Sequence, residues 1–147
     1  QYPVREIGET DEHGTQVEFL PDDSIFTESV YKYATIASRL RELAYLNKGI
    51  RITLTDRREP GENGDEFLNE TFYSEGGLAE FVQYLDGSER HALMPTPIHV
   101  VSEKGNTPVE VALQYNDSYQ ENIFSYVNNI NTHEGGTHVA GFRAALT

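Results

Sequence analysis

Between positions 33 and 46 the apolar residues recur at intervals of three and four, and this spacing limits the fold more than any other feature of the chain. Such a spacing places one apolar stripe along an amphipathic α-helix. The stripe consists of Tyr33, Ile36, Ala37, Leu40, Leu43 and Ala44, and the polar side carries Arg39, Arg41 and Glu42. Gly49 stands where a glycine commonly ends a helix. Apolar and polar residues then alternate over 50–55, which predicts that a strand follows the helix directly.

The length and composition are those of one domain or two small halves of a globular protein. The chain has 147 residues, of which 37% are apolar, and a chain of this length buries roughly two thirds of its unfolded surface. No apolar run approaches the ~20 residues of a membrane span, and the first residues show neither the basic nor the apolar region of a signal peptide. The absence of cysteine fits a reducing compartment. Because there is no initiator Met and Thr147 falls inside a helical pattern, we expect a piece of a longer protein.

The net charge of −13 argues against a protein that binds nucleic acid over its whole surface. Phosphate binding depends on Lys and Arg, and the chain has 11 of these against 24 Asp and Glu. Any contact with DNA must therefore be local. The acidity fits either a surface adapted to high salt or an ordinary acidic cytosolic protein.

The rest of the chain alternates between extended and helical patterns. Around Val17 and Phe19 the alternation with polar residues predicts a half-buried strand, which should stop at Pro21. Residues 57–69 carry proline and glycine and predict a loop. The further expected elements are a short strand at 71–74, a helix at 78–85 closed by Asp86-Gly87, a hairpin of strands across Gly105-Asn106, a strand at 123–130 and a helix from about 137 onward.

The segment His133-Glu134-Gly135-Gly136-Thr137-His138 superficially matches the zinc-protease pattern of two histidines and a glutamate. That site needs histidines four apart on one helix face, whereas these are five apart, about 140° around a helix, with two glycines between them. The sequence therefore predicts no metal site. It predicts a sharp turn at Gly135-Gly136 that opens the last helix, with Thr137 as the N-cap residue. If functional, such a turn would be an anion site at the helix start.

The other polar residues form no recognisable catalytic arrangement. The carboxylates are spread evenly, and no Ser-His-Asp or paired-carboxylate set can be argued from their spacing. Gly61 and Gly64 lack the lysine and the strand-to-helix frame of a phosphate-binding P-loop. By itself, the Gly14-Thr15 pair at a turn-to-strand junction indicates a hairpin.

Arg143 is the only Lys or Arg after Lys104. An isolated cation on an acidic surface is either the partner of an intramolecular salt bridge or a directed contact with a phosphate or a protein partner. On a helix that starts near Thr137, Arg143 lies about 100° from Phe142, at the flank of the apolar stripe.

Several blocks of sequence, spread over essentially the whole chain and in the same order, resemble the ATPase subunits of the type IIA topoisomerases, in particular the DNA gyrase B family. These blocks are Ile7 to Thr10, Gly14 to Phe19, Pro21-Asp22, Ala37 to Asn47, Tyr73 to Gly77, Val109 to Asp117 and Val127 to Thr147. The ATPase subunit of topoisomerase IV shares most of them. An inert scaffold or dimerisation module with an ATPase-like fold is the alternative from another class.

The resemblance implies the α/β (α+β) fold class in two parts. Residues 1–70 would be the C-terminal part of a GHKL ATPase sandwich, and residues 71–147 the N-terminal part of a transducer domain similar to domain 2 of ribosomal protein S5. In the family, a Gly-Thr motif and the residue two positions further on contact the adenine of ATP, and they correspond to Gly14, Thr15 and Val17. A hydroxyl can donate and accept at an adenine edge, and a β-branched side chain offers an apolar wall.

The resemblance also implies what this segment lacks. The family's catalytic Glu, Mg-binding Asn, adenine-reading Asp and lid would lie upstream, and its γ-phosphate lysine downstream, so the segment alone is expected to hold no catalytic residue and to be inactive. The whole cytoplasmic enzyme would use ATP and Mg²⁺ to close two B subunits around DNA, with the gyrase A subunit as partner and no membrane. Arg143, in the family's Gly-Phe-Arg motif, would face that DNA.

Overall fold

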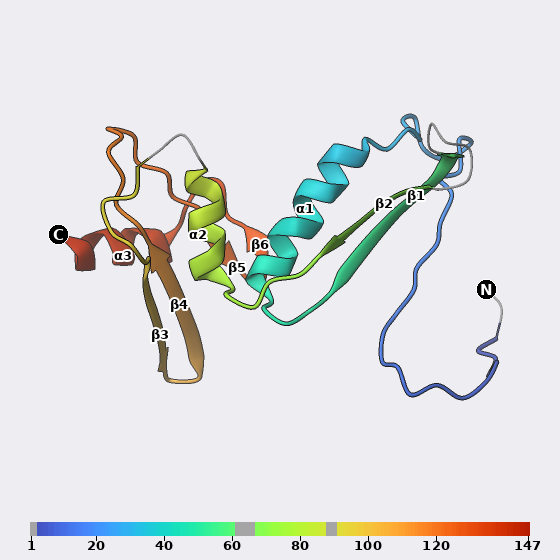
Figure 1. Cartoon of the computed structure of the whole chain (residues 1–147), viewed down its shortest axis with the longest axis horizontal. Helices are drawn as coiled ribbons and strands as arrows, with labels where there is room; N and C mark the ends of the chain where they lie inside the picture. Colours follow the sequence, from blue (N-terminus) through green and yellow to red (C-terminus); the bar gives the residue numbers. More distant parts are fainter. Residues whose placement is uncertain (1–2, 61–66, 88–90) are drawn as a thin grey trace. The chain divides into compact units, whose positions relative to one another are not determined.

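The structure, a computed structural model, describes residues 3–60, 67–87 and 91–147. Its contacts divide the chain into two compact units, which meet between Tyr31 and Lys32. Every helix and strand of the described residues belongs to the second unit (Figure 1). In chain order they are α1 (Tyr33–Leu46), β1 (Ile52–Pro60), β2 (Phe67–Phe72), α2 (Leu78–Asp86), β3 (Ile98–Lys104), β4 (Thr107–Leu113), β5 (Tyr126–Val127), β6 (Ile130–Asn131) and α3 (Thr137–Leu146). None of the described helices is long and apolar enough to cross a membrane.

The first unit contains turns but neither a helix nor a strand among its described residues. The half-buried strand expected around Val17 and Phe19 is therefore wrong, and these side chains are 77% and 65% exposed. A strand needs a neighbour that satisfies its backbone hydrogen bonds, and no described residue pairs with this stretch. A turn follows Pro21, in which the amides of Ile25 and Phe26 both donate to the carbonyl of Asp22 at 3.0 Å.

Helix α1 has the extent that its apolar spacing predicts. Its apolar side packs on β1 and β2 around Ala37, Ala44 and Phe72, which are at most 4% exposed. The surrounding half-buried side chains are Tyr33, Leu40, Ile52 and Leu54. The cap residue is Asn47, so Gly49, with φ of 86°, stands one position beyond the expected C′ site. The Gly49 amide donates to the carbonyl of Ser74 at 2.8 Å and so joins the helix end to the segment that follows β2.

Strands β1 and β2 form an antiparallel hairpin that is longer than the sequence pattern indicates. The loop expected over 57–69 is wrong at both ends, because β1 runs to Pro60 and β2 begins at Phe67. Its glycines, Gly61 and Gly64, lie outside the described residues. Facing side chains join the two strands: Thr53 with Thr71 at 3.0 Å, Asn69 with Thr55 at 2.7 Å, and the Arg57 guanidinium over the Phe67 ring at 5.8 Å. Polar residues thus extend the sheet where their polarity had indicated a loop.

Helix α2 follows a turn that the Tyr73–Gly77 block builds. Of the strand expected at 71–74, only residues 71 and 72 are strand, as the end of β2. Ser74 lies in the turn that follows and is only 1% exposed. The Ser74 hydroxyl accepts a hydrogen bond from the Gly77 amide at 2.9 Å and donates one to Glu80 at 2.5 Å. Gly77 has φ of 61° and ψ of −132°, a conformation that residues with a Cβ rarely adopt. This turn sets the start of α2, whose expected extent is confirmed.

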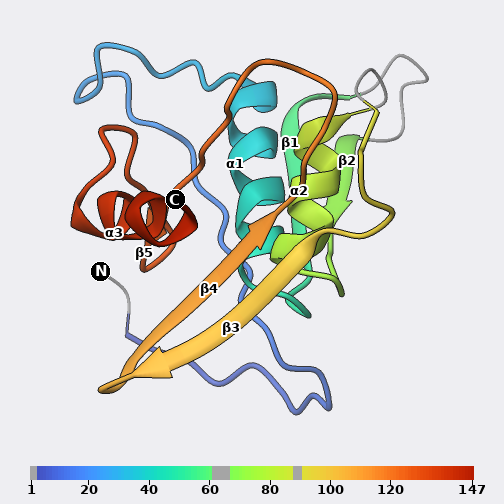
Figure 2. The same ribbon diagram turned by 90° about the vertical axis from the view of Figure 1, so that its left-hand side faces the viewer.

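Strands β3 and β4 form the expected hairpin across Gly105-Asn106. Both turn residues have positive φ, 58° and 66°, as the tightest hairpin turns require. Pairing continues without a shift from Lys104 with Thr107 at the turn to Ile98 at the other end. Figure 2 shows the turn end of this hairpin projecting away from α2, which contacts both of its strands.

The stretch after position 123 forms a tight hairpin rather than the single strand expected at 123–130. Asn128 and Asn129 have φ of 50° and 64°, which reverses the chain between β5 and β6. Asn tolerates this left-handed conformation better than most residues, because its short polar side chain can bond locally. The expected final helix is present as α3 and the turn before it is confirmed, but Gly136 is the N-cap residue and Thr137 is already helical, so the expected cap is wrong.

Aromatic side chains form a second packing centre, separate from the apolar side of α1. Phe81 of α2, which is 6% exposed, lies at its middle. Its ring centroid is 5.1 Å from Tyr45, 6.3 Å from Phe124, and 6.5 Å from both Tyr84 and Tyr126. These rings attach the β5–β6 segment to the two preceding helices.

Candidate functional site

The residues expected to contact adenine lie together in the exposed first unit. Gly14, Thr15 and Val17 are all exposed. The Thr15 hydroxyl forms no hydrogen bond to any residue that the structure describes, so its donor and acceptor functions are both available to a ligand. One hydroxyl and one apolar side chain can contact a single edge of a planar base. Further groups would have to complete a pocket.

Arg143 lies on α3 and forms an ion pair with Glu121 at 3.1 Å. Both side chains are more than half exposed, 55% and 61%, and such surface pairs contribute about 0–1 kcal/mol to stability. The salt-bridge interpretation of Arg143 is therefore confirmed. The pair is weak enough for a phosphate to replace the carboxylate, so contact with DNA stays a prediction. The structure does not relate Arg143 to Thr15, because they belong to different units.

The two histidines near the start of α3 have different surroundings from those of a metal site. In the part of the chain that the structure describes, no three His, Asp or Glu side chains are grouped so that they could hold a metal ion. The Nε2 atom of His138 lies 3.1 Å from the Thr132 hydroxyl, in hydrogen-bond contact. The imidazole thus connects α3 to the end of β6.

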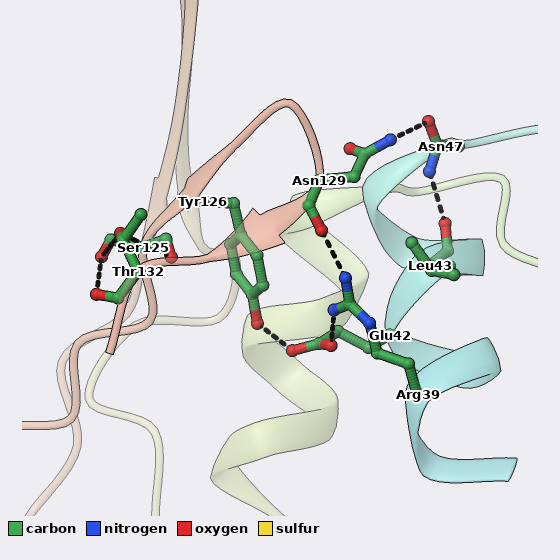
Figure 3. A network of polar contacts seen from close by, with 8 residues as sticks. All are labelled: Arg39, Glu42, Leu43, Asn47, Ser125, Tyr126, Asn129 and Thr132. Carbon is green, nitrogen blue, oxygen red and sulfur yellow. Dashed lines mark hydrogen bonds and ion pairs between the residues drawn. The ribbon is translucent and has the colours of Figure 1, made fainter. Parts of the chain in front are cut away.

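A polar network joins α1 to the β5–β6 hairpin, and sequence reasoning missed it (Figure 3). Arg39 donates to the backbone carbonyl of Asn129, 90 positions away, and forms an ion pair with Glu42. The second carboxylate oxygen of Glu42 accepts a hydrogen bond from the Tyr126 hydroxyl. Glu42 is therefore shared between a cation of its own helix and a phenol of the hairpin.

The tip of the hairpin is attached to the end of α1. The side-chain amide of Asn129 donates to Asn47 Oδ1 at 2.9 Å. Asn47 in turn donates to the carbonyl of Leu43, near the end of the helix, through its side-chain amide at 2.8 Å and its backbone amide at 3.0 Å. The hairpin tip thus takes part in capping α1.

The base of the hairpin is closed by two hydroxyl residues and leads to α3. The hydroxyls of Ser125 and Thr132 lie 2.6 Å apart, and the Thr132 hydroxyl also donates to the Ser125 carbonyl at 3.0 Å. Because Thr132 also contacts His138, the hydrogen bonds continue from the hairpin to α3.

In this network the Tyr126 phenol keeps its proton. Burial raises the pKa of Tyr126 well above its ordinary value, and the hydrogen bond to Glu42 raises it further. The phenol is therefore the donor and the carboxylate the acceptor. The Glu42 side chain is 18% exposed, and a partly buried carboxylate needs a compensating partner, which Arg39 supplies.

No local pattern of sequence could have revealed these contacts. The sequence places Arg39, Arg41 and Glu42 on the polar side of α1, but this side faces other elements as well as water. Arg41, for example, pairs with Glu70 at 2.5 Å and lies over the Phe72 ring at 5.2 Å. The one available signal was the Asn-Asn pair at 128–129, which favours a turn.

Comparison with known proteins gives matches along the whole chain. A family model described as DNA gyrase B matches residues 77–147. Over 147 residues the chain is 67% identical to the DNA gyrase B protein of Cytophaga aurantiaca and 67% identical to that of Cytophaga hutchinsonii. Each alignment covers 100% of this chain and 30% of the relative, so the chain spans about 30% of the length of these curated proteins.

Solved structures agree with the sequence matches. The 43K ATPase domain of Thermus thermophilus gyrase B, in complex with an aminocoumarin, has a TM-score of 0.71 and 32% identity, over 85% of this chain and 32% of that chain. The B-subunit of the DNA gyrase from Myxococcus xanthus has a TM-score of 0.74 and 28% identity, over 86% of this chain and 34% of that chain. The expected α/β (α+β) class is confirmed. Along its whole length, the chain therefore corresponds to a segment of the DNA gyrase B family.

Proposed function

We propose that this chain is a segment of the ATP-hydrolysing subunit of a DNA gyrase, a type IIA topoisomerase that changes DNA supercoiling by strand passage. The observation that supports this most is the 67% identity to a DNA gyrase B protein over all 147 residues. ATP-driven closure of the subunit would capture a DNA segment, and hydrolysis would reopen it. The segment itself supplies no catalytic residue, so the activity belongs to the whole protein.

The two parts of the segment would have different tasks. Residues 1–70 would complete the GHKL ATPase domain, and residues 71–147 would begin the transducer that passes closure to the DNA-cleaving part of the enzyme. The family-model match, which starts at residue 77, supports a change near this point. The proposed boundary falls within β2, whose partner strand β1 lies in the first part. The β1–β2 hairpin would therefore connect the two.

ATP would be held in part by Gly14, Thr15 and Val17. The Thr15 hydroxyl, which bonds to no residue that the structure describes, and the exposed side chain of Val17 fit one edge of an adenine base. The described residues do not form a site for the family's Mg²⁺, because they offer no group of three carboxylates or histidines. We therefore assign no step of the reaction to the metal within this segment.

The proposed partners are DNA, the gyrase A subunit and a second B subunit that associates when ATP binds, in the cytoplasm and without a membrane. The chain's charge of −13 repels DNA, so contact would be limited to single cations such as Arg143. Few phosphate contacts favour transient binding, because each one strengthens the complex and its dependence on salt.

The whole protein tests this proposal directly. The full-length protein, assembled with its gyrase A partner, is expected to introduce negative supercoils into relaxed circular DNA only when ATP is present. ATP-dependent decatenation without supercoiling would instead identify a topoisomerase IV subunit. A protein that hydrolyses no ATP would be an inert scaffold, and the proposal would be wrong.

Replacing Thr15 with Ala in the full-length protein is expected to weaken ATP binding by a few-fold to about tenfold. The loss of one hydrogen bond to a neutral group costs about 0.5–1.5 kcal/mol. Titration calorimetry with a non-hydrolysable ATP analogue measures the change. Thr27→Ala, at another exposed threonine of the same unit, is the control and should bind normally. Unchanged affinity together with a lower melting temperature would show that Thr15 has a structural role only.

Replacing Arg143 with Gln is expected to reduce DNA-stimulated ATP hydrolysis several-fold and leave DNA-independent turnover nearly unchanged. One lost phosphate contact should also reduce the salt slope of DNA binding by about 1. The matched variant is Glu121→Gln, which removes the carboxylate that competes for Arg143 and should strengthen DNA binding. An equal loss of both activities with a lower melting temperature would mean that the ion pair is only structural.

A further inference from the structure

The polar network provides a continuous series of contacts from α1 to α3. It starts at Glu42 on α1, passes to Tyr126 and the β5–β6 hairpin, and leaves through Thr132 to His138 on α3. Backbone pairing between β5 and β6 connects the two sides of the hairpin. Glu42, Tyr126 and Thr132 are half-buried, whereas His138 is exposed, and each of them lies in or directly beside a regular element.

The hairpin is anchored to α1 and its cap residue at the tip and is closed by its own hydrogen bonds at the base. At its tip, Asn129 is bonded through its carbonyl to Arg39 and through its side chain to Asn47. At its base, the Thr132 amide and hydroxyl both donate to the Ser125 carbonyl, at 2.8 and 3.0 Å. The hairpin therefore cannot move independently of α1 without breaking the hydrogen bonds of Asn129 and Tyr126.

Tyr126 takes part in both the polar and the apolar contacts of this region. Its hydroxyl donates to Glu42, while its ring packs against Phe81 of α2 with 6.5 Å between centroids. Removing the hydroxyl alone would therefore leave the ring packing in place. The polar link can be tested without disturbing the apolar cluster.

We infer that Tyr126 is a positioning residue, which with Glu42 transmits displacements of α1 to α3, the helix that carries Arg143. This inference rests on the proposed function, because it assumes that α1 shifts when ATP binds and that Arg143 contacts DNA. Coupling between two sites is reciprocal for binding, so DNA at α3 would also favour the arrangement of α1 that ATP binding favours. The network is the physical connection that both sites would bias.

The test is the Tyr126→Phe variant of the full-length protein in its complex with the gyrase A subunit. The ratio of DNA-stimulated to DNA-independent ATP hydrolysis is expected to fall about fivefold or more, the lower end of usual allosteric coupling, while DNA-independent turnover stays within about twofold. The Glu42→Ala variant, which removes the acceptor, should lower the ratio as well, and the double variant should lower it no further, because both changes break the hydrogen bond between Tyr126 and position 42.

Tyr84→Phe is the matched control. Tyr84 also contacts α1 through its hydroxyl, which accepts a hydrogen bond from Arg41 at 3.2 Å, but it belongs to α2 and lies outside the network. In the Tyr84→Phe variant, the ratio of DNA-stimulated to DNA-independent ATP hydrolysis should remain that of the wild type. An equal loss in Tyr84→Phe would mean that any contact with α1 matters, and the inference would be wrong.

Hydrogen exchange gives a readout that does not depend on DNA stimulation. In the wild type, the non-hydrolysable ATP analogue should slow amide exchange in α3, and in Tyr126→Phe this response should disappear. If the variant keeps both the response and the ATPase ratio, the inference is overturned while the proposed function stands. If both ATPase activities fall equally with the melting temperature, Tyr126 is structural, which also overturns it. A wild type that hydrolyses no ATP overturns the proposed function, and the inference with it.

Discussion

Replacing Phe81 with Ala is expected to lower the free energy of unfolding by about 3–5 kcal/mol, as for other large-to-small changes at buried aromatic residues. Phe81 is 6% exposed and is the ring that the other four aromatic side chains of its cluster contact. Its removal leaves a cavity between α1, α2 and the segment that leads into β5. Urea unfolding followed by circular dichroism measures the loss.

Phe124→Ala is the control for this prediction. Phe124 belongs to the same cluster but is 49% exposed, so its truncation opens the site to water rather than leaving a cavity. Its cost should be well below that of Phe81→Ala. Equal costs for the two variants would show that the cluster is not organised around Phe81.

The Phe72→Ala variant is also expected to lose about 3–5 kcal/mol of unfolding free energy. Phe72 is 4% exposed, packs between α1 and the β1–β2 hairpin, and carries the Arg41 guanidinium over its ring at 5.2 Å. The change removes the largest side chain of this core. The same urea titration, with thermal unfolding as a second measurement, tests the expectation.

Phe67→Ala on the same strand is the matched comparison, because Phe67 is 40% exposed. Both variants make the same change of side chain, from phenylalanine to alanine, within β2. The difference between them isolates the effect of burial. If Phe67→Ala cost as much as Phe72→Ala, the core would not lie where the structure places it.

The elements that could be predicted from the sequence are those that local patterns determine. The spacing of apolar residues gave the extent of α1 and α2, and Gly105-Asn106 gave the β3–β4 turn. In each case the decisive residues lie within a few positions of one another. Their side chains pack against a neighbouring element wherever that element is placed, so the prediction did not require knowledge of the partner.

The elements that were wrong depend on partners or on single dihedral angles. The alternation around Val17 fits a strand, but no strand of the described residues pairs with it. The polar ends of the expected 57–69 loop became strand because facing side chains bonded across the hairpin. Two left-handed residues, Asn128 and Asn129, were enough to turn one expected strand into a hairpin.

The candidate site shows the same division. Gly14, Thr15 and Val17 were assigned from a family resemblance, and their role stays a prediction. Arg143 was noticed because it is isolated in the sequence, but its partner Glu121 could not be selected among several carboxylates. The Glu42–Tyr126 contact spans 84 positions and leaves no periodic trace, so only the three-dimensional arrangement reveals it.

The two-residue turn between β3 and β4 has an evolutionary consequence. One inserted or deleted residue in either strand would move every following side chain to the opposite face of the hairpin. It would also separate His99 from Glu110, whose side chains meet at 2.8 Å across the strands. We therefore expect this hairpin to have diverged among related genes by replacement of residues, with its length held constant. Length variation would be tolerated where the pairing of strands is less regular, as near the end of β1, whose register with β2 already shifts between Asp56 and Pro60.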